Sequence, residues 1–207
     1  MERQERGHSV NILRYLYYIL LLALLSGCNA NIYIKGASYT NNNDVNVANK
    51  NITIVATKKM MSKNYELHAK RVHLYPGLIN SLYIKLNETF NNVIVIKESD
   101  YDANNYNKDS VIVIPNWEIE SRKLNTNIDA IDGKSGKHIS IEDTVIIEDR
   151  SRIRSLLYLM SCLTIVGIPI SMNIDKNDIT NKVEAALDES TSNLKSKLYA
   201  AIIKDTQ

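Results

Sequence analysis

The sequence has little net charge and few cysteines. Its 25 lysine and arginine residues nearly balance 23 aspartate and glutamate residues, which leaves a formal net charge of +2 over 207 residues. No charge excess therefore steers the chain toward nucleic acid or an anionic surface. Cysteine occurs only at Cys28 and Cys162. Cys162 stands in an apolar run, where a buried and unreactive thiol is expected.

Sequence motifs of catalysis are also missing. No Gly-x-Ser-x-Gly segment occurs, so the sequence offers no nucleophile elbow. Cys162 has no histidine near it in the sequence, which gives nothing for nucleophilic catalysis. The segment 133–135 reads Gly-Lys-Ser, as at the end of a phosphate-binding loop, but Ile128 stands where that motif needs its first glycine. We therefore interpret 133–135 as a turn.

Histidines and carboxylates do not form a convincing site either. His68 and His73 lie five residues apart near Glu66, a spacing that aligns two imidazoles on neither a helix nor a strand. The adjacent pairs at 142–143 and 148–149 are both Glu-Asp, and neighbours on a strand face opposite ways. Solvated strand faces are therefore expected instead of acid and base partners. The sequence predicts no catalytic residue, no metal, no cofactor and no enzyme activity.

An export signal is the most informative feature that is present. Arg14 precedes a mostly apolar run at 15–25, and small residues follow at 26–28. A charged region, an apolar region and small residues before a cleavage point are the layout of an export signal. The apolar run is shorter than the roughly 20 residues that a membrane-spanning helix needs. A cleaved segment is therefore favoured over a span.

The last four residues of this segment, Leu25-Ser26-Gly27-Cys28, resemble the lipobox of bacterial lipoproteins. The resemblance implies that the signal peptide 1–27 is removed, that the Cys28 thiol receives a diacylglycerol and that the new amino end is acylated, with palmitate as the expected kind of chain. Several chains at one residue suffice to hold a domain on a membrane, whereas one chain does not. The alternative is a signal-anchor helix in which Cys28 is only a small apolar residue.

The same resemblance implies a place in the cell. It indicates a Gram-negative envelope, with the protein in the outer membrane and its domain in the periplasm, because Asn29 replaces the aspartate that favours retention in the inner membrane of such lipoproteins. Acylated Cys28 would leave Cys162 without a partner, so no intrachain disulfide is expected. The mature chain would hold 207 − 27 = 180 residues, which suits one domain.

Beyond Cys28 the sequence divides into a polar stretch and a domain. Residues 28–50 are rich in asparagine, and except for a possible short strand at 32–34 they are expected to act as a tether that lifts the domain off the bilayer. Residues 51–207 are expected to form one domain. Its first core strand is expected at 52–57, and residues 58–74 remain ambiguous.

Helices and strands of this domain follow from hydrophobic spacing. A helix is predicted from about residue 75, since apolar residues recur every fourth position from Leu78 to Phe90. Strands are expected at 93–96 and 111–114, the second broken by Pro115, and a hairpin is expected around 132–137. A final helix is predicted at 181–204 with a capping box of Asn181 and Glu184. The predicted fold class is α/β or α+β: a small mixed β-sheet with an amphipathic helix after the first core strand and a C-terminal helix.

A second apolar run, at 155–174, carries no charged residue. It is long enough to span a membrane, but Gly167 and Pro169 would weaken its last turns. Three arginines precede it, on the wrong side for a positive-inside orientation. Three interpretations remain open: a buried helix followed by a turn and a strand, a surface that touches lipid or a membrane protein, and a transmembrane helix.

These observations lead to a functional expectation with two alternatives. The expected protein is a lipid-anchored, non-enzymatic envelope component in structure, assembly or interaction, whose partners are the membrane through Cys28 and another envelope protein, with no nucleic acid. The first alternative is a membrane-embedded component with a transmembrane helix at 155–174. The second is a hydrolase or ligand binder whose site forms only in three dimensions.

Overall fold

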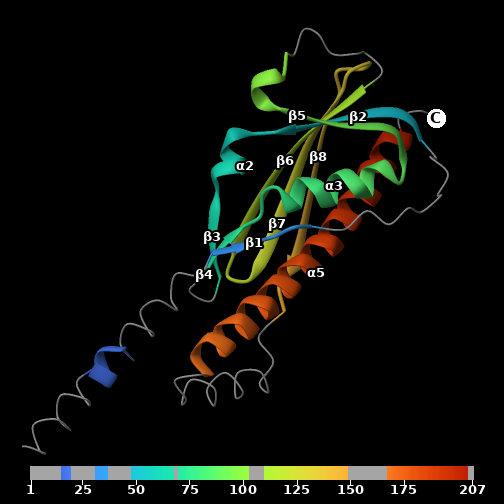
Figure 1. The fold of residues 1–207 in the computed structure, drawn as a ribbon. Helices are drawn as coiled ribbons and strands as arrows, with labels where there is room; N and C mark the ends of the chain where they lie inside the picture. The colour runs from blue at the N-terminus through green and yellow to red at the C-terminus, as the bar shows by residue number, and fades with distance from the viewer. Residues whose placement is uncertain are drawn as a thin grey trace, which may run out of the picture.

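A computed structural model of the chain describes residues 15–19, 31–36, 48–67, 70–102, 110–148 and 167–204. Within these residues it contains two β-sheets and two longer helices (Figure 1). This arrangement confirms the mixed α and β fold class, in its α+β form. The expected acylation site Cys28, together with His68, Cys162 and residues 155–166, lies outside the described residues.

The larger sheet has five strands in the order β5-β2-β6-β7-β8. Its strands are β2 (Ala48–Ala56), β5 (Phe90–Lys97), β6 (Ser110–Glu120), β7 (Lys123–Asp132) and β8 (His138–Ile146). Strand β2 pairs in parallel with both β5 and β6, whereas β6, β7 and β8 form an antiparallel meander. The hairpin expected around 132–137 is confirmed as the β7–β8 connection.

The smaller sheet has three strands in the order β1-β4-β3. Strand β1 (Asn31–Tyr33) runs parallel to β4 (Lys70–His73), which pairs antiparallel with β3 (Asn64–Leu67). A short helix, α2 (Lys58–Ser62), leads from β2 into this sheet, and the Thr57 hydroxyl accepts from the backbone N–H of Met60 at its start. The ambiguous region 58–74 is therefore one helix and one hairpin.

Two helices pack on one face of the large sheet. Helix α3 (Gly77–Asn87) lies on β5 and β2, helix α5 (Gly167–Lys204) lies on β8 and β7, and the two helices contact each other. A short 3-10 turn, η1 (Glu98–Asp100), follows β5. The apolar stripe expected on the last helix is fully buried in the core: Val183, Leu187, Leu194, Leu198 and Ile202.

Several predicted boundaries were wrong. Helix α3 ends at Asn87, and Phe90 is the first residue of β5 instead of the last apolar residue of the helix. Strand β6 runs through Pro115 without a break. Pairing of β6 with β2 ends at Val113. Pro115 has no backbone N–H to donate, and it lies beyond the residues that pair with β2, so the strand continues through it.

Two parts of the stretch 28–50, which the sequence predicts to be a tether with a possible short strand, belong to strands β1 and β2. Residues Ile32 and Ile34 are buried in the core, and β2 already begins at Ala48. The side chain of Glu184 on α5 accepts a hydrogen bond from the backbone N–H of Lys35 at 3.3 Å. This described segment begins at Asn31, three residues after Cys28.

The last helix also starts earlier than predicted. Helix α5 begins at Gly167, so the expected capping box of Asn181 and Glu184 lies inside the helix. The turn and strand expected after Leu163 are wrong for residues 167–174, which are helical. Pro169 fits there because the first turn of a helix does not use its backbone donors. Within the part of the chain that the structure describes, no helix is both long and apolar enough to cross a membrane.

Candidate binding surfaces

The residues singled out for chemistry have structural roles in the described part of the chain. His73 stacks on Tyr33 with ring centroids 4.5 Å apart, and its Nε2 lies 3.4 Å from Asn31 Oδ1. These contacts join β4 to β1. No group of three or more metal-ligating side chains occurs among the described residues.

The Gly-Lys-Ser segment forms the β7–β8 turn, and the Gly133 backbone N–H donates to the Ser110 carbonyl of β6 at 2.9 Å. Asp132 accepts from the Ser135 hydroxyl at 2.8 Å, from the Lys134 backbone N–H at 3.3 Å and from Lys50 Nζ at 3.2 Å. Partial burial alone would raise the pKa of Asp132, but these hydrogen bonds and the charge of Lys50 outweigh it and lower the pKa. Interpretation of this segment as a turn is confirmed.

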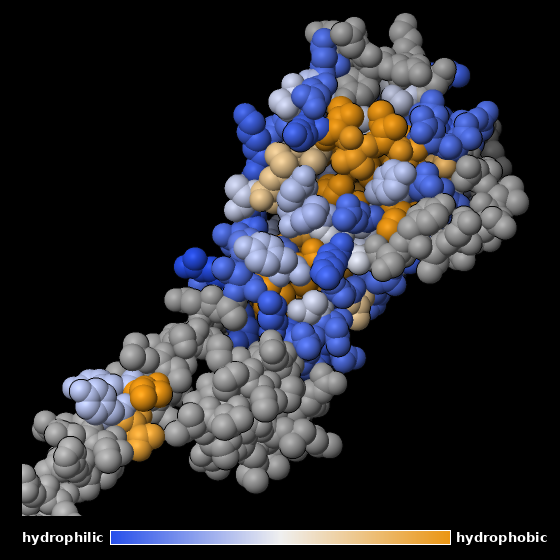
Figure 2. Space-filling model, in the orientation of Figure 1, coloured by the Kyte–Doolittle hydropathy of each residue, from blue (hydrophilic) through white to orange (hydrophobic). Residues whose placement is uncertain are grey.

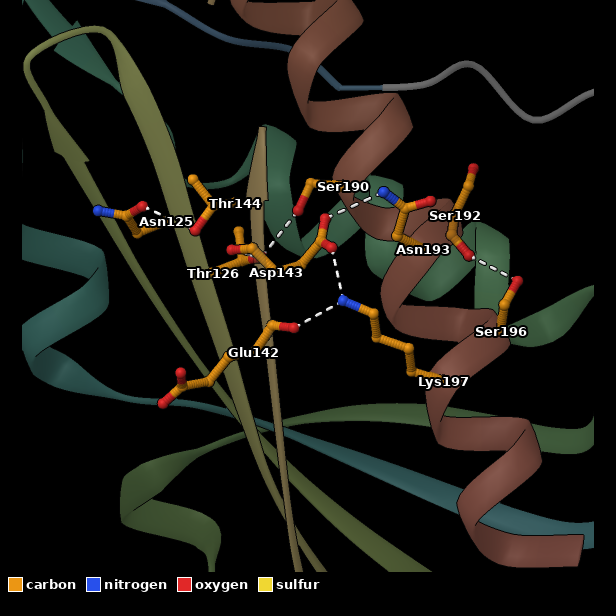
Figure 3. A network of polar contacts seen from close by, with 10 residues as sticks. All are labelled: Asn125, Thr126, Glu142, Asp143, Thr144, Ser190, Ser192, Asn193, Ser196 and Lys197. Carbon is orange, nitrogen blue, oxygen red and sulfur yellow. Dashed lines mark hydrogen bonds and ion pairs between the residues drawn. The ribbon is translucent and has the colours of Figure 1, made fainter. Parts of the chain in front are cut away.

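The Glu142-Asp143 pair behaves as its strand position predicts (Figure 3). Asp143 points toward α5, where its carboxylate contacts Lys197 Nζ at 2.7 Å and Asn193 Nδ2 at 3.1 Å. The Glu142 side chain points away, and only its backbone carbonyl accepts from Lys197. The pair is therefore split between two faces of β8.

A buried hydroxyl pair extends this polar network between sheet and helix. Thr126 Oγ1 lies 2.8 Å from Ser190 Oγ and also donates to the Asp143 carbonyl at 3.2 Å. Both side chains are almost fully buried, so each hydroxyl needs the partner that the other supplies. The network fixes how α5 sits on β7 and β8, which is a structural role.

A shallow polar recess lies on the sheet face that neither α3 nor α5 covers. Its volume is about 360 Å³, and its exposed lining comes from alternate residues of β6, β7 and β8: Asn116, Glu118, Asn125, Asn127, Glu142 and Thr144. The Thr144 hydroxyl donates to Asn125 Oδ1 at 3.0 Å across two of these strands. Cross-strand bonding of this kind stabilises the meander itself.

The outer edge of β5 carries two adjacent exposed apolar side chains. Ile94 is 46% exposed and Val95 is 42% exposed, although neighbouring residues of a strand face opposite sides of the sheet. Figure 2 shows hydrophobic side chains gathered where β5 and β2 lie. Among the described strands, β5 pairs with β2 alone and so presents one edge without a partner strand. We call the edge formed by Val93–Ile96 the β5 edge.

Sequence reasoning missed this surface. Residues 93–96 form an unbroken apolar run, which is typical of a strand buried on both faces. Only the strand order places the run at the end of the sheet. A weak signal was present in the polar residues Asn91 and Asn92, which are exposed at the start of β5.

One buried polar atom lacks a protein partner among the described residues, namely the Nε1 of Trp117. Its backbone carbonyl accepts a short hydrogen bond from the Tyr65 hydroxyl, which joins β3 to β6. Burial, with the nearby Glu118 charge, raises the pKa of Tyr65. Tyr65 therefore stays protonated as a donor, and this contact holds the small sheet against the large one.

Comparison with known proteins found no match: no family model, no curated protein and no solved structure is similar to this chain.

Proposed function

We propose that this protein is a lipid-anchored lipoprotein of a Gram-negative envelope whose domain binds another envelope protein and performs no catalysis. The lipobox supports the anchor, with Cys28 as the acylated residue in the outer membrane and the domain in the periplasm. The observation that carries the binding role is the β5 edge, where Ile94 and Val95 are exposed on opposite faces of an unpaired strand.

Such an edge suits a partner that adds a strand. Backbone donors and acceptors along an edge strand can pair with an extended segment of another protein, while alternate side chains give contacts on both faces. The two exposed residues would lose most of their water contact on pairing, and burying one such side chain contributes about 1.5–3 kcal/mol. A protein strand therefore fits this edge better than a small polar ligand does.

Partner binding should depend on the apolar character of the β5 edge. With a photo-crosslinking residue at Val95 in cells, we expect one specific protein adduct, and the added substitution Ile94→Lys should weaken partner binding by at least roughly tenfold. The lysine would place a charge in the apolar contact between the β5 edge and its partner. The control substitution Asn80→Lys, on the exposed side of α3, should leave the adduct unchanged. An adduct that Ile94→Lys does not reduce would rule out this edge as the binding surface.

Acylation is tested separately from partner binding. Replacing Cys28 with serine should abolish incorporation of labelled fatty acid and block normal cleavage of the signal, because the serine hydroxyl does not replace the thiol that is lipidated. Intact mass and label incorporation of both proteins give the measurement, and Cys162→Ser is the matched control, which should remain acylated. Uptake of label by the Cys28→Ser protein would contradict the anchor assignment.

A further inference from the structure

We propose that one end of the domain lies flat against the bilayer that holds the acyl chains; this inference rests on the proposed lipid anchor at Cys28. We call it the proximal end and define it by the start of β1 at Asn31, the β6–β7 turn at 121–122, the end of β8 at Ile146 and the start of α5 at 167–176. These segments are far apart in the sequence. Hydrogen bonds and ion pairs between described residues bring these four segments close together.

Two contacts define this end of the large sheet. One joins β8 to the β6–β7 turn, and the other joins the small sheet to β6. The backbone N–H of Ile147 donates to the Arg122 carbonyl at 2.8 Å, which places the end of β8 beside the β6–β7 turn. Lys63 Nζ contacts Glu118 Oε1 at 3.1 Å, which places the start of β3 next to β6 shortly before the same turn. The small sheet thus extends along the side of the turn (Figure 1).

Two further contacts bring β1 and α5 to the same end. Asn31 is in register with Arg71 on β4, and the preceding residue, Lys70, forms an ion pair with Asp175 of α5 at 3.3 Å. The chain enters β1 at Asn31, so only residues 29 and 30 separate it from Cys28. Three residue steps span at most about 11 Å. The acylated residue therefore holds the proximal end close to the lipid, without a long tether.

The chemistry of the proximal end suits lipid. Ile146 is 70% exposed and Tyr33 is 60% exposed, and both stand on strands of this end. Residues 167–174 of α5 contain no charge and form about 12 Å of helix before Asp175. In Figure 1 this uncharged start of α5 extends past the small sheet.

Electrostatic attraction is not needed for contact between the proximal end and the bilayer. Exposed bases and exposed acids balance at this end: Arg71, Arg122, Lys123 and Lys176 against Glu66, Glu118, Glu120 and Glu148. The contact then depends on the acyl chains, on exposed Ile146 and on Tyr33, because a tyrosine favours the boundary between water and hydrocarbon. Neutral lipid should suffice for it.

The opposite end of the domain offers a reference. The β7–β8 turn at 133–136 is separated from the β6–β7 turn by the length of β7, whose ten residues span about 33 Å. Lys134 is exposed in that distant turn. A label there should remain in water if the proximal end faces the membrane.

Fluorescence quenching by lipid tests this orientation. Acylated full-length protein carrying Cys162→Ser is labelled with an environment-sensitive dye at Ile146→Cys, Lys123→Cys or Lys134→Cys and incorporated into phosphatidylcholine vesicles. Brominated phosphatidylcholine should quench the labels at 146 and 123 several-fold more than the label at 134. Lys123→Cys is included because it replaces an exposed residue and leaves the apolar Ile146 in place.

The outcomes separate this inference from the proposed function. Intact mass establishes acylation for each labelled protein, and its absence would refute the anchor itself. Acylated protein in which position 134 is quenched as strongly as 146 and 123, or in which none is quenched, would overturn the orientation while the anchor stands.

Discussion

Replacing Lys70 with methionine is expected to lower the free energy of unfolding by about 3–5 kcal/mol, which is the usual cost of removing one partner of a buried ion pair. The side chains of Lys70 and Asp175 are only 5% and 7% exposed, and their charged atoms lie 3.3 Å apart. Methionine fills most of the same volume, so the loss arises mainly from the Asp175 carboxylate that remains buried. Urea unfolding at neutral pH measures it, provided that the slope of the transition is unchanged.

Two further variants separate the buried charge from a general loss of packing. The double variant Lys70→Met with Asp175→Leu should recover much of the stability, because no uncompensated charge remains. Lys85→Met removes a lysine that also contacts α5, through Asp188, but that carboxylate is 54% exposed, so the loss should stay below about 1 kcal/mol. Equal losses in Lys70→Met and Lys85→Met, or no recovery in the double variant, would contradict the argument.

Hydrophobic periodicity predicted the helices whose buried residues recur at regular spacing along the chain. The repeat of Leu78, Leu82 and Leu86 indicated α3, and the stripe from Val183 to Ile202 indicated the C-terminal part of α5. Each of these leucines is buried against the sheet, so the spacing that a helix imposes is visible in the sequence. The Asp-Gly signal likewise predicted the β7–β8 hairpin.

Other features depend on contacts that no local pattern contains. Ser121 and Arg122 both adopt positive φ values, 47° and 65°, in the two-residue β6–β7 turn, although neither residue type marks such a turn. The sequence allowed a short strand at 32–34 but gave no reason to place Ile32 and Ile34 in the core, because polar residues surround them in the chain. Their burial needs β4 on one side and the core below.

The candidate surface could be predicted only in part. A lipobox is a local motif, so Cys28 could be proposed from the sequence alone. The β5 edge could not, because exposure of Ile94 follows from the strand order and not from its neighbours in the chain. Lys70 is the opposite case: the sequence predicts an exposed lysine, but the side chain is buried. Its burial depends on Asp175 of α5, which forms an ion pair with it.

Replacing Gly77 with alanine is expected to destabilise the protein by several kcal/mol, against the trend for helices, where alanine is favoured over glycine by about 1 kcal/mol. Gly77 is the first residue of α3 and is buried. A Cβ there would lie 2.6 Å from the Ile34 carbonyl carbon and 2.7 Å from the backbone nitrogen of Gly36, and it would meet the Ile34 carbonyl oxygen even more closely. These are backbone atoms, so no side-chain rotation relieves the clash.

The clash should first separate residues 31–36 from α3, because the atoms that a Cβ at Gly77 would meet belong to Ile34 and Gly36. Hydrogen exchange should show faster exchange at the Ile34 amide, which donates to the His73 carbonyl at 3.0 Å, together with a lower midpoint of urea unfolding. Gly136→Ala is the matched control. Unlike Gly77, Gly136 has a positive φ of 67°, but nothing lies within 4 Å of a Cβ there, so only about 1–2 kcal/mol of backbone strain is expected. If Gly77→Ala unfolds at the same urea concentration as the unsubstituted protein, residues 34–36 do not pack against α3, and the short link between the acyl chains and the domain is wrong.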